Sequence, residues 1–234
     1  MALLSKIDYF GLSGSGFEPQ DTSENKQAGY IAEAQGPNGF LVAQDVGADI
    51  VAPSVTYVAT QDVSIEDVKL GTVKTILGKK VALGGLTINT GAGQPVTCTA
   101  TGQQVDDAGR EGCTCTLSGV ELEYRFHAQD FGLFTVSGGQ LNQSTLNITP
   151  TIADARIDGV IKAWDLVGGS LRVSGTIIGV DDDGNISTPS ITINDPSGNV
   201  GEGVITQPLT QTNPNGQYPT YSFEITYPLK ADED

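Results

Sequence analysis

The residue best suited to acid–base chemistry is His127, the only histidine of the chain. Residues 120–128 alternate between apolar and polar, which predicts a strand with His127 on its polar face beside Glu123. An imidazole next to a carboxylate can act as a general base. However, the sequence contains neither a Gly-x-Ser-x-Gly nucleophile motif nor a His-x-x-x-His pair. We therefore interpret His127 as an ordinary surface residue of a strand and expect no enzymatic activity.

A run of three aspartates is the second candidate, as a calcium site. Asp181, Asp183 and Asn185 alternate as the first ligands of an EF-hand loop do. That loop requires Gly at the next position, where this chain has Ile186, and Pro189 lies on the approach to the bidentate Glu position. The sequence therefore predicts a hairpin tip whose carboxylates face water, and no metal site.

Three cysteines lie close together in the sequence: Cys98, Cys113 and Cys115. A hairpin that turns at residues 108–109 would place Cys98 opposite Gly119, which disfavours a disulfide. A fourth ligand that would complete a zinc site is not nearby. We therefore expect small buried thiols in a reducing compartment. The glycine-rich segment 11–16 lacks the Lys-Ser/Thr of phosphate-binding loops, so we expect no cofactor.

The chain of 234 residues has a net charge of −16. This charge repels phosphate backbones and anionic lipids, so we expect no sequence-specific nucleic-acid binding and no membrane association. No stretch approaches the roughly 20 apolar residues that span a bilayer. The N-terminal apolar run is too short for a secretory signal, so we expect synthesis in a cytoplasm. Trp164, the only tryptophan, is expected in the core or in an interface.

The elements that must position these residues are β-strands. Gly, Thr and Ser are abundant and charged residues make up only 17% of the chain, as in β proteins with many tight turns. Alternation predicts strands over 54–60, 73–77, 81–89, 120–128, 133–136, 145–152, 155–167, 170–180, 201–209 and 219–227. One short helical turn is expected at 64–70. The predicted fold class is all-β: an antiparallel β-sandwich or barrel with an extended N-terminal arm and at most one short helix.

One segment occurs twice in the chain. Residues 96–109 and 171–184 both end in Val-Asp-Asp-x-Gly, and each is followed by a second strand rich in Thr and Ser. Asp and Gly tolerate the dihedral angles of turns, so we expect a duplicated β-hairpin at 96–120 and 171–193. Residues 51–234 are then predicted to form one β domain that contains both copies.

Residues 1–50 are expected to form an extended arm. No period of 2 or 3.6 residues persists between residues 12 and 44, and a free loop of this length is unusual unless it is functional or disordered. The arm carries apolar side chains that could form an assembly interface with a neighbouring subunit: Tyr30, Ile31, Phe40, Leu41 and Val42.

The Gly-rich arm, Thr/Ser-rich strands such as Leu86–Asn89, and the segment Pro95–Gly102 give the chain a resemblance to structural proteins of tailed bacteriophages. It is similar in style to tail tube proteins, in which β-sandwich or barrel subunits form rings and arms bridge adjacent subunits. The resemblance implies stacked homo-oligomeric rings with an acidic lumen along which DNA slides. It also implies that the partners are copies of the chain and other virion proteins, first in the host cytoplasm and then in the virion.

Two other functions stay open. The first is a capsid-decorating or receptor- or carbohydrate-binding β module, which would be a monomer or a trimer. The second is a polysaccharide hydrolase, which would have a cleft with converging carboxylates near His127. An aromatic content of 6% weakens the case for a sugar-stacking platform.

Overall fold

The computed structural model of the chain describes residues 7–28, 31–35, 37, 41–46, 49–65, 70–106, 121–124, 126–157, 160–194, 200–213 and 217–230. Strands dominate these ranges, and η1 (Leu12–Ser15) is a short 3₁₀ turn. The predicted all-β class is therefore confirmed. Ser64, the expected cap of a helical turn at 64–70, is the last residue of strand β5 (Val63–Ser64); Ile65, which follows it, has 3₁₀ conformation, and residues 66–69 lie outside the described ranges.

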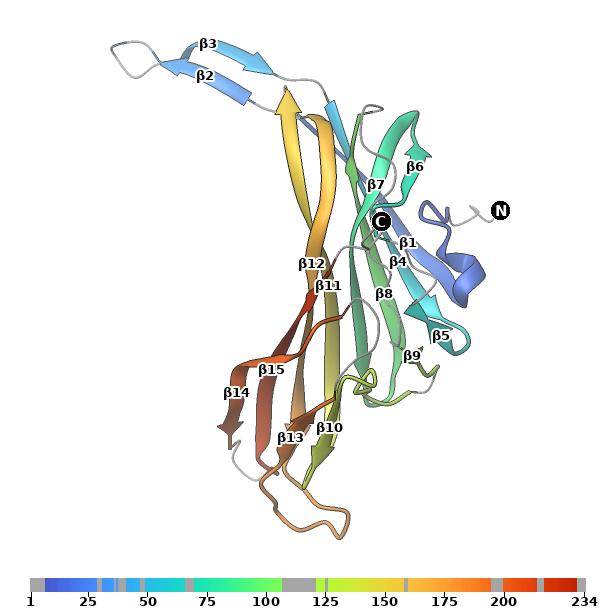
Figure 1. Ribbon diagram of the computed structural model, residues 1–234, viewed down its shortest axis with the longest axis vertical. Helices are drawn as coiled ribbons and strands as arrows, with labels where there is room; N and C mark the ends of the chain where they lie inside the picture. Colours follow the sequence, from blue (N-terminus) through green and yellow to red (C-terminus); the bar gives the residue numbers. More distant parts are fainter. Residues whose placement is uncertain are drawn as a thin grey trace.

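Nine strands form one large antiparallel sheet (Figure 1). Eight of them follow one another across the sheet in the order β1 (Phe17–Ala28), β4 (Asp49–Ala59), β8 (Gln94–Gln104), β7 (Lys79–Gly91), β11 (Gln140–Ile157), β12 (Val160–Ile178), β15 (Thr220–Leu229) and β14 (Val204–Thr212). The ninth, β6 (Val73–Ile76), pairs with β7. Hairpins join β7 to β8 and β11 to β12, so neighbours in the sequence are neighbours in the sheet at its centre.

One face of the large sheet forms the core. The register aligns a row of almost fully buried residues across six neighbouring strands: Tyr57, Cys98, Ile88, Leu146, Val173 and Ile225. Residues one step along each strand point to the opposite face, as alternation requires. Except for Val58, these outward residues are polar, and two pairs bond across the strands: Thr87 Oγ1 donates to Asn147 Oδ1 at 2.9 Å, and Thr145 Oγ1 to Asn89 Oδ1 at 2.9 Å. The sheet therefore has an apolar inner face and a polar outer face.

Short strands and turns cover the inner face as a second layer. β5 pairs with β9 (Glu121–Leu122), and β10 (Phe134–Ser137) pairs with β13 (Ser190–Ile193). The ring of Phe134 meets the ring of Phe223 on β15 edge-on, with 5.1 Å between their centroids. The fold is thus a two-layer β structure around one main hydrophobic core.

The pairing predicted for the duplicated hairpin is wrong. The first part of the first copy lies in β8, and Cys98 lies between Tyr57 of β4 and Ile88 of β7, not opposite Gly119. The first part of the second copy lies in β12, which is flanked by β11 and β15. After β12 the chain forms an antiparallel bridge across its turn, between Val180 and Ile186, and then crosses to the covering layer as β13. Both edges of each strand are already occupied, which a sequence repeat does not reveal. Residues 107–120 lie outside the described ranges.

The first fifty residues are not one arm. β1 belongs to the large sheet, and Phe10, Leu12 and Phe17 are buried in its core. The part that projects from the main body is a hairpin of β2 (Ile31–Gln35) and β3 (Leu41–Val46) (Figure 1). The boundary predicted at residue 50 therefore does not separate the arm from the domain. β1 shows little apolar alternation because it is an edge strand, whose described side chains beyond Phe17 are at least partly exposed.

Candidate assembly surfaces

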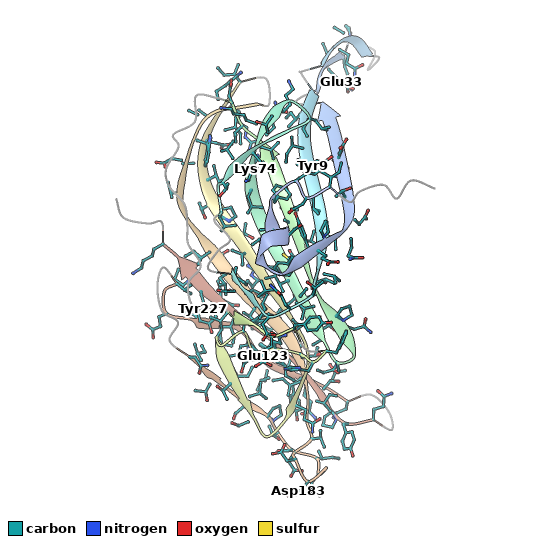
Figure 2. The ribbon with its side chains drawn as sticks, turned by 90° about the vertical axis from the view of Figure 1, so that its right-hand side faces the viewer. Tyr9, Glu33, Lys74, Glu123, Asp183 and Tyr227 are labelled. Atoms are coloured by element: carbon teal, nitrogen blue, oxygen red, sulfur yellow. The ribbon has the colours of Figure 1, made fainter. Side chains whose placement is uncertain are left out.

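The β2–β3 hairpin projects from the main body of the molecule (Figure 1). Its strands pair with each other as a separate two-stranded sheet, with Ile31 opposite Val46 and Gln35 opposite Leu41. Its described side chains are all exposed: Glu33, Ala34, Gln35, Ala43 and Gln44. Figure 2 shows Glu33 at one end of the molecule, beyond the large sheet. The described side chains of the hairpin thus face solvent and not the core of the chain.

The predicted interface residues lie in or next to this hairpin. Ile31 belongs to β2, and Leu41 and Val42 belong to β3, but only the backbone of these three residues is described. Tyr30 and Phe40 lie outside the described ranges. The structure therefore places the predicted segment at an exposed position, and the apolar contacts of its side chains stay a prediction.

A two-stranded ribbon carries the hairpin away from the sheet. β1 and β4 are paired as far as Ala28 and Asp49, whereas β8 accompanies β4 only over Ser54–Val58. The buried side chain of Gln104 anchors the ribbon where it leaves the sheet, because its Oε1 accepts the backbone N–H of Val51 at 2.9 Å. The base of the hairpin is therefore held against the large sheet.

The two edges of the large sheet differ in charge. The edge strand β1 exposes three carboxylates, on Glu18, Asp21 and Glu24. The opposite edge strand, β14, contains no charged residue and is exposed along almost its whole length, with 60% of Val204 accessible. An unpaired edge is a template for another strand, and charges on an edge blunt this tendency. Each edge strand contains a proline and an irregular register, Pro19 on β1 and Pro208 on β14. By charge alone, β14 is the edge more open to pairing.

The carboxylate of Asp8 fixes the conformation of the chain that precedes β1. It accepts backbone N–H groups from Gly11 at 2.8 Å, Leu12 at 3.1 Å and Ser13 at 2.9 Å, and the hydroxyl of Tyr57 at 2.8 Å. Burial raises the pKa of Asp8, but these hydrogen bonds outweigh it and hold the pKa below its usual value. This role of Asp8 was not predicted, although Asp side chains commonly accept backbone N–H groups of a turn that follows them.

His127 does not lie on a strand. β9 ends at Leu122, and the segment that follows is irregular and exposed, so the strand predicted over 120–128 is wrong beyond its first residues. The side-chain amide of Gln129 forms hydrogen bonds with both the backbone N–H and the backbone carbonyl of Glu123. A strand at this position would need these two groups to pair with a neighbouring strand. His127 Nε2 lies 4.0 Å from Glu123 Oε2, and both side chains line a pocket.

The aspartate run forms a tight turn. Asp181 Oδ1 accepts the backbone N–H of Asn185 at 2.8 Å and of Asp183 at 3.1 Å. The hydrogen bond from Asn185 contributes most to lowering the pKa of the Asp181 carboxyl. The described residues contain no group of three His, Cys, Asp or Glu side chains that could hold a metal ion. The prediction of a turn at this position is confirmed.

Two further sequence candidates are buried. Cys98 is a free thiol, and burial raises its pKa to about 12; Cys113 and Cys115 lie outside the described ranges. Trp164 packs against Ala82 and Ile161 in a second, smaller apolar cluster. Both burials match the prediction.

The fold and these surfaces define a two-layer β protein with a projecting hairpin and two open sheet edges. No model of a known protein family matches the chain, and no curated protein matches it. A helix long and apolar enough to cross a membrane is not found among the residues that the structure describes.

Proposed function

We propose that the chain is a non-enzymatic structural protein that self-assembles, as the subunit of a phage tail tube built from stacked rings. The observation that carries this proposal is the β2–β3 hairpin. A two-stranded hairpin alone is marginally stable in water, yet this one projects from the main body with its described side chains exposed. A neighbouring subunit would supply the packing surface that the hairpin lacks.

The two sheet edges would close the ring. Contact between two different surfaces of neighbouring subunits gives a closed ring when the rotation between them closes. Pairing of the uncharged β14 with the acidic β1 of the next subunit would place no like charges opposite each other. A contact between two β1 edges would bring the carboxylates of Glu18, Asp21 and Glu24 together. The heterologous contact is therefore favoured.

The charge of the chain supports a tube that conducts DNA. A net charge of −16 repels phosphate, so DNA would pass an acidic lumen without sticking. The polar outer face agrees with this role. Arg172 is the one basic residue in the central row of this face, and its Nε lies 3.6 Å from Glu224 Oε1. That row consists of Thr56, Thr99, Thr87, Asn147, Arg172 and Thr226. Such a subunit would assemble in the host cytoplasm and remain in the virion.

The second candidate is a capsid-decorating or carbohydrate-binding module. One observation favours it: Tyr124 and Phe126 are exposed, and each is next in sequence to a residue that lines a pocket, Glu123 or His127. A module of this kind would be a monomer or trimer that forms no rings by itself.

Replacement of residues 29–48 by Asn-Gly tests the role of the hairpin. Ala28 and Asp49 are paired at its base, and Asn-Gly closes two paired strands in a type I′ turn. We expect the shortened chain to keep the circular dichroism spectrum and thermal midpoint of the intact protein. Rings and stacks, seen by light scattering after size exclusion and by negative-stain microscopy, should disappear.

The matched control is Glu33→Gln, which keeps the hairpin and removes one exposed charge. This variant should assemble as the intact chain does. Rings that persist without residues 29–48 would show that the hairpin is not an assembly element.

A further inference from the structure

The hairpin of β6 and β7 forms a basic surface on an acidic protein. Lys74 on β6 and Lys79 on β7 are exposed, and no ion pair is found for either of them in the described part of the chain. Between residues 68 and 105 the sequence contains no Asp or Glu, although the chain as a whole has a net charge of −16. The hairpin therefore suits an acidic partner.

An apolar side chain stands at the turn of this hairpin. Strand pairing ends at Ile76 and Lys79, and the two residues between them, Leu77 and Gly78, have positive φ angles of 52° and 72°. Such two-residue loops favour Asn and Gly, because a residue with a Cβ atom is strained in the left-handed region. Leu77 nevertheless occupies the first position and is 45% exposed, whereas Ile76 is buried in the main core. The turn thus presents Leu77 to solvent on a hairpin that is anchored in the core.

An acidic turn lies on the connection between β12 and β13. The carboxylate of Asp181 accepts backbone N–H groups within the turn, whereas Asp182 and Asp183 are exposed. Ile186, which is bridged to the other side of the turn, is 74% exposed. No Lys, Arg or His occurs between residues 173 and 229, so no cation in this stretch offsets the negative charge. The turn thus presents two carboxylates and one apolar side chain on a hydrogen-bonded backbone.

The basic hairpin and the acidic turn lie at opposite ends of the molecule. In Figure 1, β6 lies in the half from which the β2–β3 hairpin projects, and the connection between β12 and β13 forms the other end. Figure 2 shows Lys74 and Asp183 separated in the same way. Each surface has exposed charges and an exposed apolar residue, and the charges of the two surfaces have opposite signs. The acidic turn of one copy is therefore complementary to the basic hairpin of a second copy that points the same way along the long axis.

We propose that the acidic turn of each subunit binds the β6–β7 hairpin of a subunit in the next ring. This contact rests on the proposed function, because it joins one ring of the tube to the next. The two exposed carboxylates of the turn lie beside the two lysines of the hairpin, and Ile186 packs against Leu77. Contact between two different surfaces repeats without limit along a straight axis, as a stack requires. It uses neither the β2–β3 hairpin nor the edges of the large sheet, so single rings form without it.

Charge reversal at each end of the molecule tests the proposal. The double variant Lys74→Glu/Lys79→Glu has two acidic ends, and the double variant Asp182→Lys/Asp183→Lys has two basic ends. We expect each variant alone to form rings of the intact size but no stacks, as measured by sedimentation velocity and negative-stain microscopy. When rings of the two variants are mixed, stacks should return, because acidic ends then meet basic ends. All four side chains are exposed, so the thermal midpoint should not change.

The matched control is Lys230→Glu, which reverses an exposed lysine outside both surfaces and should leave the stacks intact. Salt gives a second measurement on the intact chain. Raising it from about 0.1 M to about 1 M shortens the screening length from about 10 Å to about 3 Å, so the stacks should separate into rings. Rings that stack equally well in each variant, that do not stack when mixed, or that stay stacked in the higher salt would overturn this contact and leave the ring proposal standing. An intact chain that forms no rings would overturn the proposed function and the stacking contact together.

Discussion

Removal of residues 1–28 is expected to unfold the protein. This deletion takes away Phe10, Leu12 and Phe17, each of which is buried in the main core. Burial of such a side chain contributes about 1.5–3 kcal/mol, so the three together approach the roughly 5–15 kcal/mol by which a typical domain is stable. The deletion also removes β1, the strand that pairs with β4 from residue 49 to residue 59.

A loss of hydrogen bonds adds to this effect. Without Asp8, the hydroxyl of the buried Tyr57 loses its hydrogen-bond acceptor. An unsatisfied buried polar group lowers the free energy of unfolding by about 1–3 kcal/mol. Circular dichroism and urea unfolding measure the outcome, with the 29–48 replacement as the folded control. A cooperative unfolding transition in the chain without residues 1–28 would contradict the assignment of this segment to the core.

Leu146→Ala is expected to destabilise the protein by about 3 kcal/mol, because a buried Leu→Ala change costs about 2–5 kcal/mol in a well-packed core. Leu146 is fully buried on β11, between Ile88 on one neighbouring strand and Val173 on the other. Strands on both sides restrain the backbone, so the cavity cannot collapse. Urea unfolding monitored by Trp164 fluorescence measures the change.

The control for this variant lies on the same strand. Ile157 ends β11 and is exposed, so Ile157→Ala should change the free energy of unfolding by less than about 0.5 kcal/mol. Similar effects of the two substitutions would contradict the division of β11 into a buried half and an exposed half.

Strands with one buried face could be predicted from the sequence. The predicted strand 81–89 lies within β7, and 219–227 matches β15 closely, because alternate residues enter the core and alternate residues do not. β1 could not be predicted in this way, since an edge strand needs few apolar residues. The order of the strands in the sheet could not be predicted either, because the repeated segments 96–109 and 171–184 do not indicate which strands lie next to them.

The candidate surfaces were only partly predictable. An apolar, Gly-rich segment indicated an exposed arm, and the β2–β3 hairpin lies within it. By contrast, the alternation over 120–128 predicted a strand, whereas Gln129 binds the backbone of Glu123 and leaves Tyr124 and Phe126 in solvent. Gln129 reaches Thr90 and Ser144 across the fold, and no local sequence pattern encodes contacts of this range.

The central claim is that the chain builds rings by itself. Its most direct test is the particle mass of the purified intact protein, measured by light scattering after size exclusion and compared with negative-stain images of the same fractions. The tail tube assignment predicts rings or stacked tubes of many copies. A monodisperse monomer or trimer at every concentration would contradict it and would favour a decorating or saccharide-binding module.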